Sequence, residues 1–179
     1  VRNVAERWLD RNGESQAAGL VLSAWLRSGV EFPSAQERVL NWLSRHCLHE
    51  GAIHVTHAWN QFGGDIALAR DLLLNQIRES KSLCSAWVPM TIWMKLGFSY
   101  DDLSDILEQW FVTFGGEVDA QHLISSWLDA VEECDAVESH AKFWLEKNGT
   151  HPDARFVLTS WIYRIHDPNE VAPQIDQWI

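Results

Sequence analysis

The sequence predicts an all-α fold, an α-solenoid of about five helical hairpins followed by a partial terminal helix. Three observations lead to this prediction: tryptophans recur at a fixed interval, alanines recur at the same interval, and glycines that can end helices fall between them. Hydrophobic residues make up 46% and charged residues 22% of the 179 residues, so the chain can bury a core.

The tryptophans form two series in which neighbours are 34 residues apart, as in Trp8 and Trp42. The first series is Trp8, Trp42, Trp110, Trp144 and Trp178, with Gln76 in the vacant place, and the second is Trp25, Trp59, Trp93, Trp127 and Trp161. Only Trp87 of the 11 tryptophans lies outside both series. A fixed interval of this length is typical of proteins in which each repeat is one helical hairpin.

Two further columns keep the same register. Ala18, Ala52, Ala86, Ala120 and Ala154 form one, and Leu9, Leu43, Ile77, Phe111, Leu145 and Ile179 form the other. Their spacing predicts two amphipathic helices in each repeat, over about 2–12 and 16–28 in the first, and a last partial helix from about 171. We interpret the alanine as the point where two helices approach closely, and the tryptophans as core residues that bridge neighbouring hairpins.

Glycines, caps and prolines predict where these helices begin and end. Left-handed helix stops are expected at Gly13, Gly29, Gly63, Gly64, Gly97, Gly115, Gly116 and Gly149, and N-caps at Ser15, Ser34, Asp101 and Thr150. Pro89 falls inside a predicted second helix, where it should remove a hydrogen bond and bend the helix. The bend would open a pocket near Trp87 and Met90, although a compensated packing variant also explains the proline.

The net charge and the cysteine content limit which partners and which compartment we expect. The 14 basic and 25 acidic residues give a net charge of −11, which opposes binding to nucleic acid or anionic lipid and favours a basic or neutral partner. Cys47, Cys84 and Cys134 are too few and too far apart for a disulfide framework, so we expect a reducing compartment. With no membrane-length apolar run or signal pattern, we expect a cytoplasmic protein, and a single array over 1–179 that belongs to a larger chain with further domains.

The 34-residue period, the small residue at the Ala18 column and the glycine at the turn near Gly13 resemble the tetratricopeptide (TPR) family over essentially the whole chain. The family's Trp-x-x-Leu-Gly-x-x-Tyr string is absent, and tryptophan stands late in the second helix, so the chain is TPR-like. The segment WLEKNGTHPDARFVLTSWI (144–162) is also similar to repeats found beside NTPase or protease modules in bacterial signalling and antiphage-defence proteins.

The TPR resemblance implies a non-enzymatic scaffold or sensor domain that binds a protein or peptide along a concave face lined by the first helices. The candidate partner-binding residues are Arg7, Asn41, Asn75, Gln109 and Phe143 in one column, with Gln177, and Glu37, Asp71 and Asp105 in a second, with Asn3 and Ser139. Side-chain amides both donate and accept hydrogen bonds, so this row suits an extended or helical segment. The same polar residues could instead only solvate the helices.

A cluster of histidines is the one concentrated chemical signal. His46, His49, His54 and His57 lie close to Cys47, and a zinc site among them is conceivable, although their spacing matches no established zinc motif and a polar, partly exposed turn explains them without a metal. The sequence lacks a Gly-x-Ser-x-Gly elbow and a phosphate-binding loop, so we expect neither an enzyme nor a bound cofactor or metal. Two alternatives stay open: an intramolecular spacer between effector domains, and a metalloprotein built on these histidines.

Overall fold

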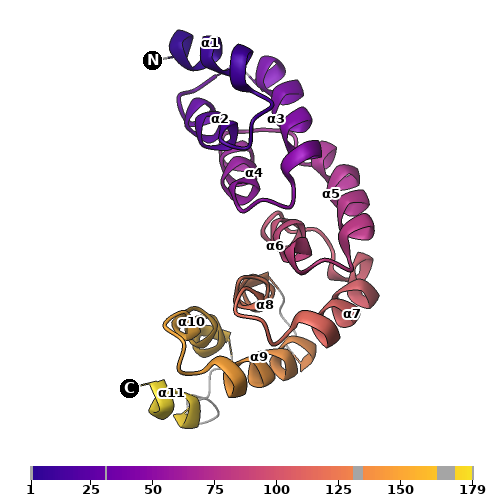
Figure 1. Ribbon diagram of the computed structural model, residues 1–179, viewed down its shortest axis with the longest axis vertical. Helices are drawn as coiled ribbons and strands as arrows, with labels where there is room; N and C mark the ends of the chain where they lie inside the picture. Colours follow the sequence, from indigo (N-terminus) through magenta and orange to yellow (C-terminus); the bar gives the residue numbers. More distant parts are fainter. Residues whose placement is uncertain (1, 31, 131–134, 165–171, 179) are drawn as a thin grey trace. The chain divides into compact units, whose positions relative to one another are not determined.

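The computed structural model describes residues 2–30, 32–130, 135–164 and 172–178, and every regular element in these ranges is helical (Figure 1). This confirms the all-α prediction. The α-helices are α1 (Arg2–Asn12), α2 (Ala18–Arg27), α3 (Phe32–His46), α4 (Gly51–Gln61), α5 (Ala67–Ser80), α6 (Trp87–Lys95), α7 (Ser104–Phe114), α8 (Ala120–Ala130), α9 (Asp135–Asn148), α10 (Ala154–Arg164) and α11 (Ala172–Trp178). Two 3-10 turns, η1 (Cys84–Ala86) and η2 (Tyr100–Asp102), precede α6 and α7. Among the described helices, none is both long and apolar enough to cross a bilayer.

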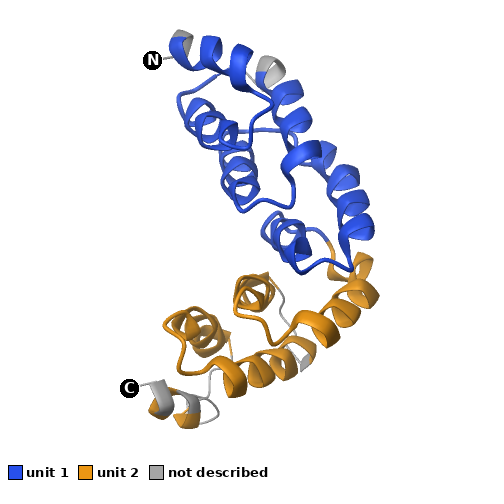
Figure 2. Cartoon of the chain, viewed as in Figure 1, with its two compact units in different colours: residues 1–98 blue, residues 99–179 orange. Residues whose placement is uncertain are grey.

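The chain divides into two compact units, Val1–Phe98 and Ser99–Ile179 (Figure 2). The first unit contains α1 to α6 and the second α7 to α11. The division follows the end of α6 and therefore coincides with the end of a predicted repeat.

Within each unit, the second helices of the hairpins pack most closely on one another. In the first unit α2 lies against α4 and α4 against α6, and in the second unit α8 lies against α10. The first helices α1, α3 and α5 form the other row of the first unit, and they are in looser contact (Figure 1). The resemblance implies that first helices line a concave groove, which should be the closely packed side. The placement of the first helices on a concave face stays a prediction.

The turn between the two helices of a hairpin has the same backbone hydrogen bonds in every repeat. In the first repeat the N–H of Ser15 donates to the carbonyl oxygen of Asn12 at 2.9 Å, and the N–H of Ala18 donates to that of Ser15 at 3.0 Å. The same two bonds recur at His49 and Ala52, Leu83 and Ala86, Glu117 and Ala120, and His151 and Ala154. The 34-residue period therefore describes the backbone as well as the side chains.

The four predicted N-caps are wrong, at Ser15 and Thr150 because of this right-handed turn. Ala17, which precedes α2, has φ −64° and ψ −16°, so the chain enters the helix without the extended residue that a side-chain cap needs. The Ser15 hydroxyl donates backwards to the carbonyl of Asn12, and Ser34 lies inside α3. Asp101 lies within η2, while Thr150 precedes α10 by a full turn.

One glycine after each of α2, α4 and α6 takes the left-handed conformation, as predicted, whereas the predicted stop at Gly64 does not. Gly29, Gly63 and Gly97 have φ values of 78°, 91° and 74°. The prediction is wrong after the first helices, where Gly115 has φ −60° and Gly13 bonds back to the carbonyl of Leu9. The reason is the right-handed turn described above, which continues the helical sense and needs no left-handed residue.

Nine of the tryptophans are buried in the core, as predicted, whereas Trp8 is 36% exposed, and the two series differ in their polar contacts. Trp42 and Trp144 of the first series are 1% and 0% exposed, and their indole N–H groups donate to the carbonyls of Ser15 and Glu117 at 2.9 and 2.8 Å. Each acceptor lies 27 residues earlier, in the preceding hairpin. In the second series the buried indole nitrogens of Trp25, Trp59 and Trp161 have no hydrogen-bond partner among the described residues.

The prediction of a bend at Pro89 is corrected, because the helix that contains this proline begins later than expected. The turn η1 replaces the beginning of this second helix, so α6 starts at Trp87 and Pro89 is in its first turn. The first four N–H groups of a helix have no partner within it, so a proline there removes no hydrogen bond. Trp87 and Met90 are buried, so the expected open pocket beside them is not formed.

Candidate functional site

All eight predicted partner-binding residues have solvent-exposed side chains. In the first unit Arg7 lies on α1, Glu37 and Asn41 on α3, and Asp71 and Asn75 on α5; in the second, Asp105 and Gln109 lie on α7 and Phe143 on α9. Ser139 is also exposed, while the side chains of Asn3 and Gln177 are outside the described part of the structure. The expected exposure is therefore confirmed, and partner binding by these residues stays a prediction.

The amide groups of this column make no contacts that would occupy them. Asn41, Asn75 and Gln109 have no side-chain hydrogen-bond partner among the described residues, and only their main-chain carbonyls accept bonds, from Ser44 and Thr113 in two cases. Each amide can therefore offer one acceptor and two donor hydrogens to a partner without breaking an interaction within the protein.

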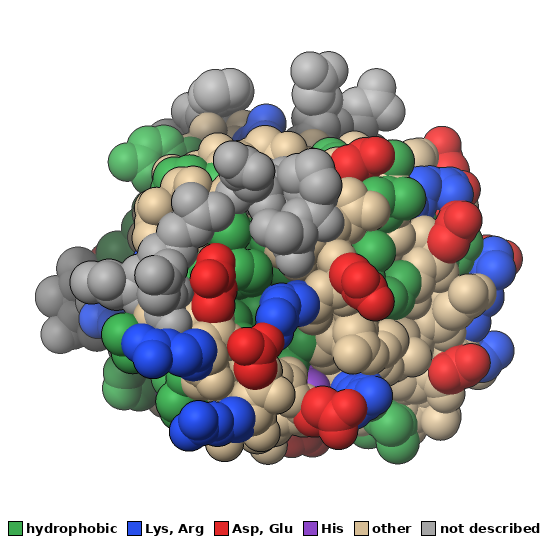
Figure 3. Space-filling model, turned by 90° about the horizontal axis from the view of Figure 1, so that it is seen from above, with side chains coloured by type: hydrophobic (Ala, Val, Ile, Leu, Met, Phe, Trp, Pro, Cys, Tyr) green, Lys and Arg blue, Asp and Glu red, His purple; other side chains and the backbone are tan. Residues whose placement is uncertain are grey.

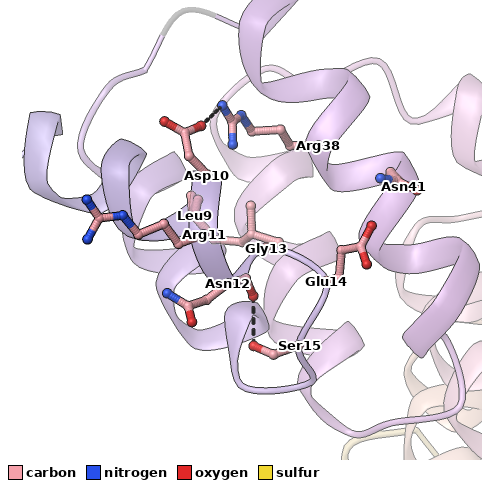
Figure 4. A pocket seen from close by; sticks show the side chains of 10 residues that line it. Leu9, Asp10, Arg11, Asn12, Gly13, Glu14, Ser15, Arg38 and Asn41 are labelled. Atoms are coloured by element: carbon pink, nitrogen blue, oxygen red, sulfur yellow. Dashed lines mark hydrogen bonds and ion pairs between the residues drawn. The ribbon is translucent and has the colours of Figure 1, made fainter.

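Asn41 lies at the edge of a polar pocket of about 490 Å³ (Figure 4). The pocket is bounded by the end of α1, the turn 13–15 and two side chains of α3, Arg38 and Asn41. Nη2 of Arg38 lies 2.5 Å from Oδ1 of Asp10, and these side chains are 39% and 55% exposed. A pair this exposed contributes little to folding, so both charges are accessible to a ligand.

A second ion pair lies at the same junction between the first two hairpins. Nη1 of Arg45 is 2.8 Å from Oε1 of Glu14, and Glu14 also lines the pocket. Charges of both signs and an unoccupied amide therefore surround one hollow. Such a surface can bind polar main-chain groups and ionised side chains of a peptide.

Two of the three equivalent positions in the second unit carry hydrophobic residues. Three repeat periods after Asp10, Arg38 and Asn41 stand Val112, His140 and Phe143. Val112 is 86% and Phe143 is 52% exposed, although both are hydrophobic. Phe143 was among the predicted partner-binding residues, Asp10 and Val112 stand in a third column that the TPR resemblance places on the same face, and Arg38 was not predicted. The repeat register could have identified Arg38 as well, because it lies one helical turn from Asn41 of the candidate column.

His140 is held between an aromatic ring and a carboxylate. Its ring stacks on Phe111 with a centroid distance of 4.3 Å and an angle of 15°, and Nε2 lies 3.2 Å from a carboxylate oxygen of Glu108. Trp127 is farther away, with its ring centroid at 5.9 Å. The imidazole thereby links α9 to α7 and fixes the helix that carries Phe143.

The histidines of the second repeat do not converge on one point. His46 contacts the carbonyl of Glu14 through Nε2 at 2.8 Å, and its ring packs on Trp42 with centroids 5.1 Å apart. Asn148, three periods later, makes the corresponding contact, from Nδ2 to the carbonyl of Gly116 at 3.1 Å. His46 is therefore a contact between hairpins.

The remaining members of the cluster have separate environments. Nδ1 of His49 accepts the N–H of Gly51 at the start of α4, while His54 and His57 are exposed. Among the described residues, no three histidine, cysteine or acidic side chains are placed to hold a metal ion. Cys47 is buried, and this burial raises the pKa of its thiol to about 12. The metalloprotein alternative therefore lacks a ligand set in the described structure.

Comparison with known proteins gives no relative for this chain. No protein-family model matches it, and neither the curated proteins nor the solved structures give a significant match.

Proposed function

We propose that this chain is a non-enzymatic, TPR-like α-solenoid that binds a protein or peptide along the exposed side of its first helices. The observation that carries the proposal is a set of exposed amides at one repeat position, Asn41 and Asn75 in the first unit and Gln109 in the second, whose side chains have no hydrogen-bond partner among the described residues. Asn41 and Asn75 stand one period apart in the first unit, and both amides can hydrogen-bond to main-chain groups of a bound segment. Gln109 offers the same groups on the second unit.

The neighbouring residues define the chemistry of the partner. Glu37, Asp71 and Asp105 add exposed carboxylates beside the amides, and the chain carries a net charge of −11. Opposite charge steers association and favours the correct partner, so the bound segment is neutral or basic. On the second unit, the exposed pair Val112 and Phe143 suits an apolar side chain.

The resemblance of residues 144–162 to repeats of bacterial signalling and defence proteins supports a sensor role. In this version of the proposal, partner binding is passed to further domains of the same chain. The alternative is a spacer that only holds such domains apart, and it requires no partner for the exposed amides.

A peptide-binding selection tests the proposal. The chain and an Asn41→Ala/Asn75→Ala/Gln109→Ala variant are each used to select binders from a library of unstructured peptides with mixed charge. The double variant Asn60→Ala/Gln61→Ala is the matched control, because it removes two exposed amides from the second helix α4. Circular dichroism establishes that all three chains have equal helicity.

The expected result is a set of neutral or basic peptides that bind the chain and the control equally. Each amide hydrogen bond is worth about 1 kcal/mol, so the triple variant should bind them at least about tenfold more weakly. Binding that survives the triple change removes the first-helix surface from the proposal. The failure of every peptide to bind favours the spacer.

A further inference from the structure

The first hairpin leaves open a face that corresponding residues bury in later hairpins. This end face consists of Ala5 and Trp8 on α1 and Val21 and Ala24 on α2, which line a groove of about 610 Å³. Trp8 is 36% exposed, whereas Trp42 and Trp144, which occupy the same place in the second and fifth repeats, are 1% and 0% exposed. The difference lies in what covers the ring.

The other columns of the end face repeat this contrast. The counterparts of Ala5, Val21 and Ala24 in the second and fifth repeats are Val39 and Ala141, Val55 and Val157, and Ala58 and Ser160, all of them buried. In the first repeat Ala24 is exposed, and Ala5 and Val21 are partly exposed. Val4 and Leu20, which are 62% and 68% exposed, extend the apolar surface at its rim. Figure 3 views the molecule from above Figure 1 and shows hydrophobic side chains lying among charged ones.

The described junctions show what covers this face in later repeats. The indole of Trp42 reaches the turn of the preceding hairpin and donates to the carbonyl of Ser15, and Trp144 does the same to that of Glu117. The Trp42 ring also fills the space beside Gly19, where an added Cβ would lie 2.6 Å from Cζ2. The covering surface is thus a helical hairpin whose turn carbonyl can accept a second hydrogen bond and which leaves room for an indole ring.

We propose that the end face of the first hairpin is the docking surface for another helical hairpin of the same repeat type, carried N-terminally on the same polypeptide. The source follows from the two described junctions, because in both the covering hairpin is the preceding one, 27 residues before the tryptophan that it receives. The incoming hairpin has a right-handed turn whose carbonyl accepts from Trp8, and a small residue against the ring. This inference does not depend on the proposed partner binding.

The test places a second copy of residues 1–34 directly before Val1. In the natural chain those residues cover Trp42, so the added copy presents the same surface to Trp8. Hydrogen exchange measured by mass spectrometry on peptides from α1 and α2 reports whether the end face is covered. A chain extended by a glycine-serine segment of equal length is the control, and a second control carries Trp8→Ala behind the added copy.

We expect the added hairpin to slow amide exchange in α1 by at least about tenfold, and the glycine-serine segment to leave exchange unchanged. Trp8→Ala should abolish most of that protection. The added copy carries the same surface that folds on Trp42, so it should also be able to fold on Trp8. Unchanged exchange in α1, or an added hairpin whose own amides stay unprotected, would therefore overturn the proposal.

Sedimentation of the chain without any extension tests whether a second copy of the chain covers the end face instead. We expect a monomer at all concentrations and the same behaviour for Ala24→Asp. A dimer that Ala24→Asp dissociates would show that a second copy covers the end face, and would overturn the proposal.

Discussion

The indole N–H of Trp42 and the N–H of Ala18 donate to the same carbonyl oxygen, that of Ser15, at 2.9 and 3.0 Å. One oxygen therefore closes the turn of the first hairpin and holds the second hairpin against it. Its two lone pairs are both used, which a main-chain carbonyl allows. The same arrangement recurs at Glu117, Ala120 and Trp144.

Replacing Trp42 by phenylalanine should destabilise the protein more than the same change at Trp8. Trp42→Phe removes a buried hydrogen bond and leaves a gap, so we expect the free energy of unfolding to fall by about 1–3 kcal/mol. Trp8 is partly exposed, so Trp8→Phe should change it by less than about 0.5 kcal/mol. Urea unfolding followed by circular dichroism measures both. Equal losses would contradict the role given to the Trp42 contact.

Gly19 should tolerate alanine only when Trp42 is reduced in size. A Cβ at Gly19 would meet Cζ2 of Trp42 at 2.6 Å, so Gly19→Ala should cost about 1–3 kcal/mol of stability despite the better helix propensity of alanine. In a Trp42→Phe background the cost should largely disappear. Gly29→Ala is the control, because its Cβ would meet open space and its cost arises from the φ of 78°. That cost should be independent of Trp42, and a double-mutant cycle measures both couplings.

The protein should lose stability in alkali through the Cys47 thiol. Burial raises the pKa of this thiol from 9.0 to about 12, so the folded state keeps a proton that the unfolded state loses between these values. The stabilisation is fully present below pH 9.0 and decreases as the pH rises toward 12. The difference in unfolding free energy between the natural chain and Cys47→Ala should change by about 1.4 kcal/mol per pH unit in that range.

The comparison with Cys47→Ala is needed because a second group, Tyr100, should also lower the stability of the protein in alkali. The pKa of Tyr100 is raised from 10.0, mainly by burial and further by the charges of Glu108, Asp101 and Asp105. Tyr100 is present in both chains, so its effect cancels in the difference. Identical pH profiles for the natural chain and Cys47→Ala would contradict the assignment to Cys47.

The ion pair between Arg38 and Asp10 should matter little for folding. Both side chains are more than one third exposed, so Arg38→Gln and Asp10→Asn should each lower the unfolding free energy by less than about 1 kcal/mol. Their coupling should shrink further in high salt, because screening weakens exposed charge pairs. Thermal unfolding of the two single variants and the double variant at low and high salt measures this. A coupling that salt does not reduce would show that the pair is effectively buried.

The elements of the fold were predictable because their period appears in the side chains themselves. The tryptophan and alanine columns placed α1 to α10 in the correct order, and glycine identified the ends of α2, α4 and α6. The turns between paired helices were not predictable from cap residues. Main-chain bonds such as that from Ala18 to Ser15 satisfy these turns, and such bonds leave no signature in residue type.

The candidate site was predictable only as far as exposure follows from helical register. That reasoning placed Asn41, Asn75 and Gln109 on the surface, where the structure has them. It could not place the pocket beside Asn41, because Arg38 and Asp10 approach each other from neighbouring hairpins. The assignment of the first helices to a concave side came from the resemblance alone, and it stays a prediction.

The use of a main-chain oxygen as the acceptor for Trp42 and Trp144 bears on how this sequence can diverge. The residues that supply this oxygen are Ser15 and Glu117, which share no side-chain chemistry. Selection on the contact therefore acts on the tryptophan and on the path of the turn, and leaves the side chain at the acceptor position unconstrained. A gene encoding such repeats can duplicate or exchange one unit and still form the junction, while the faces exposed to partners change independently.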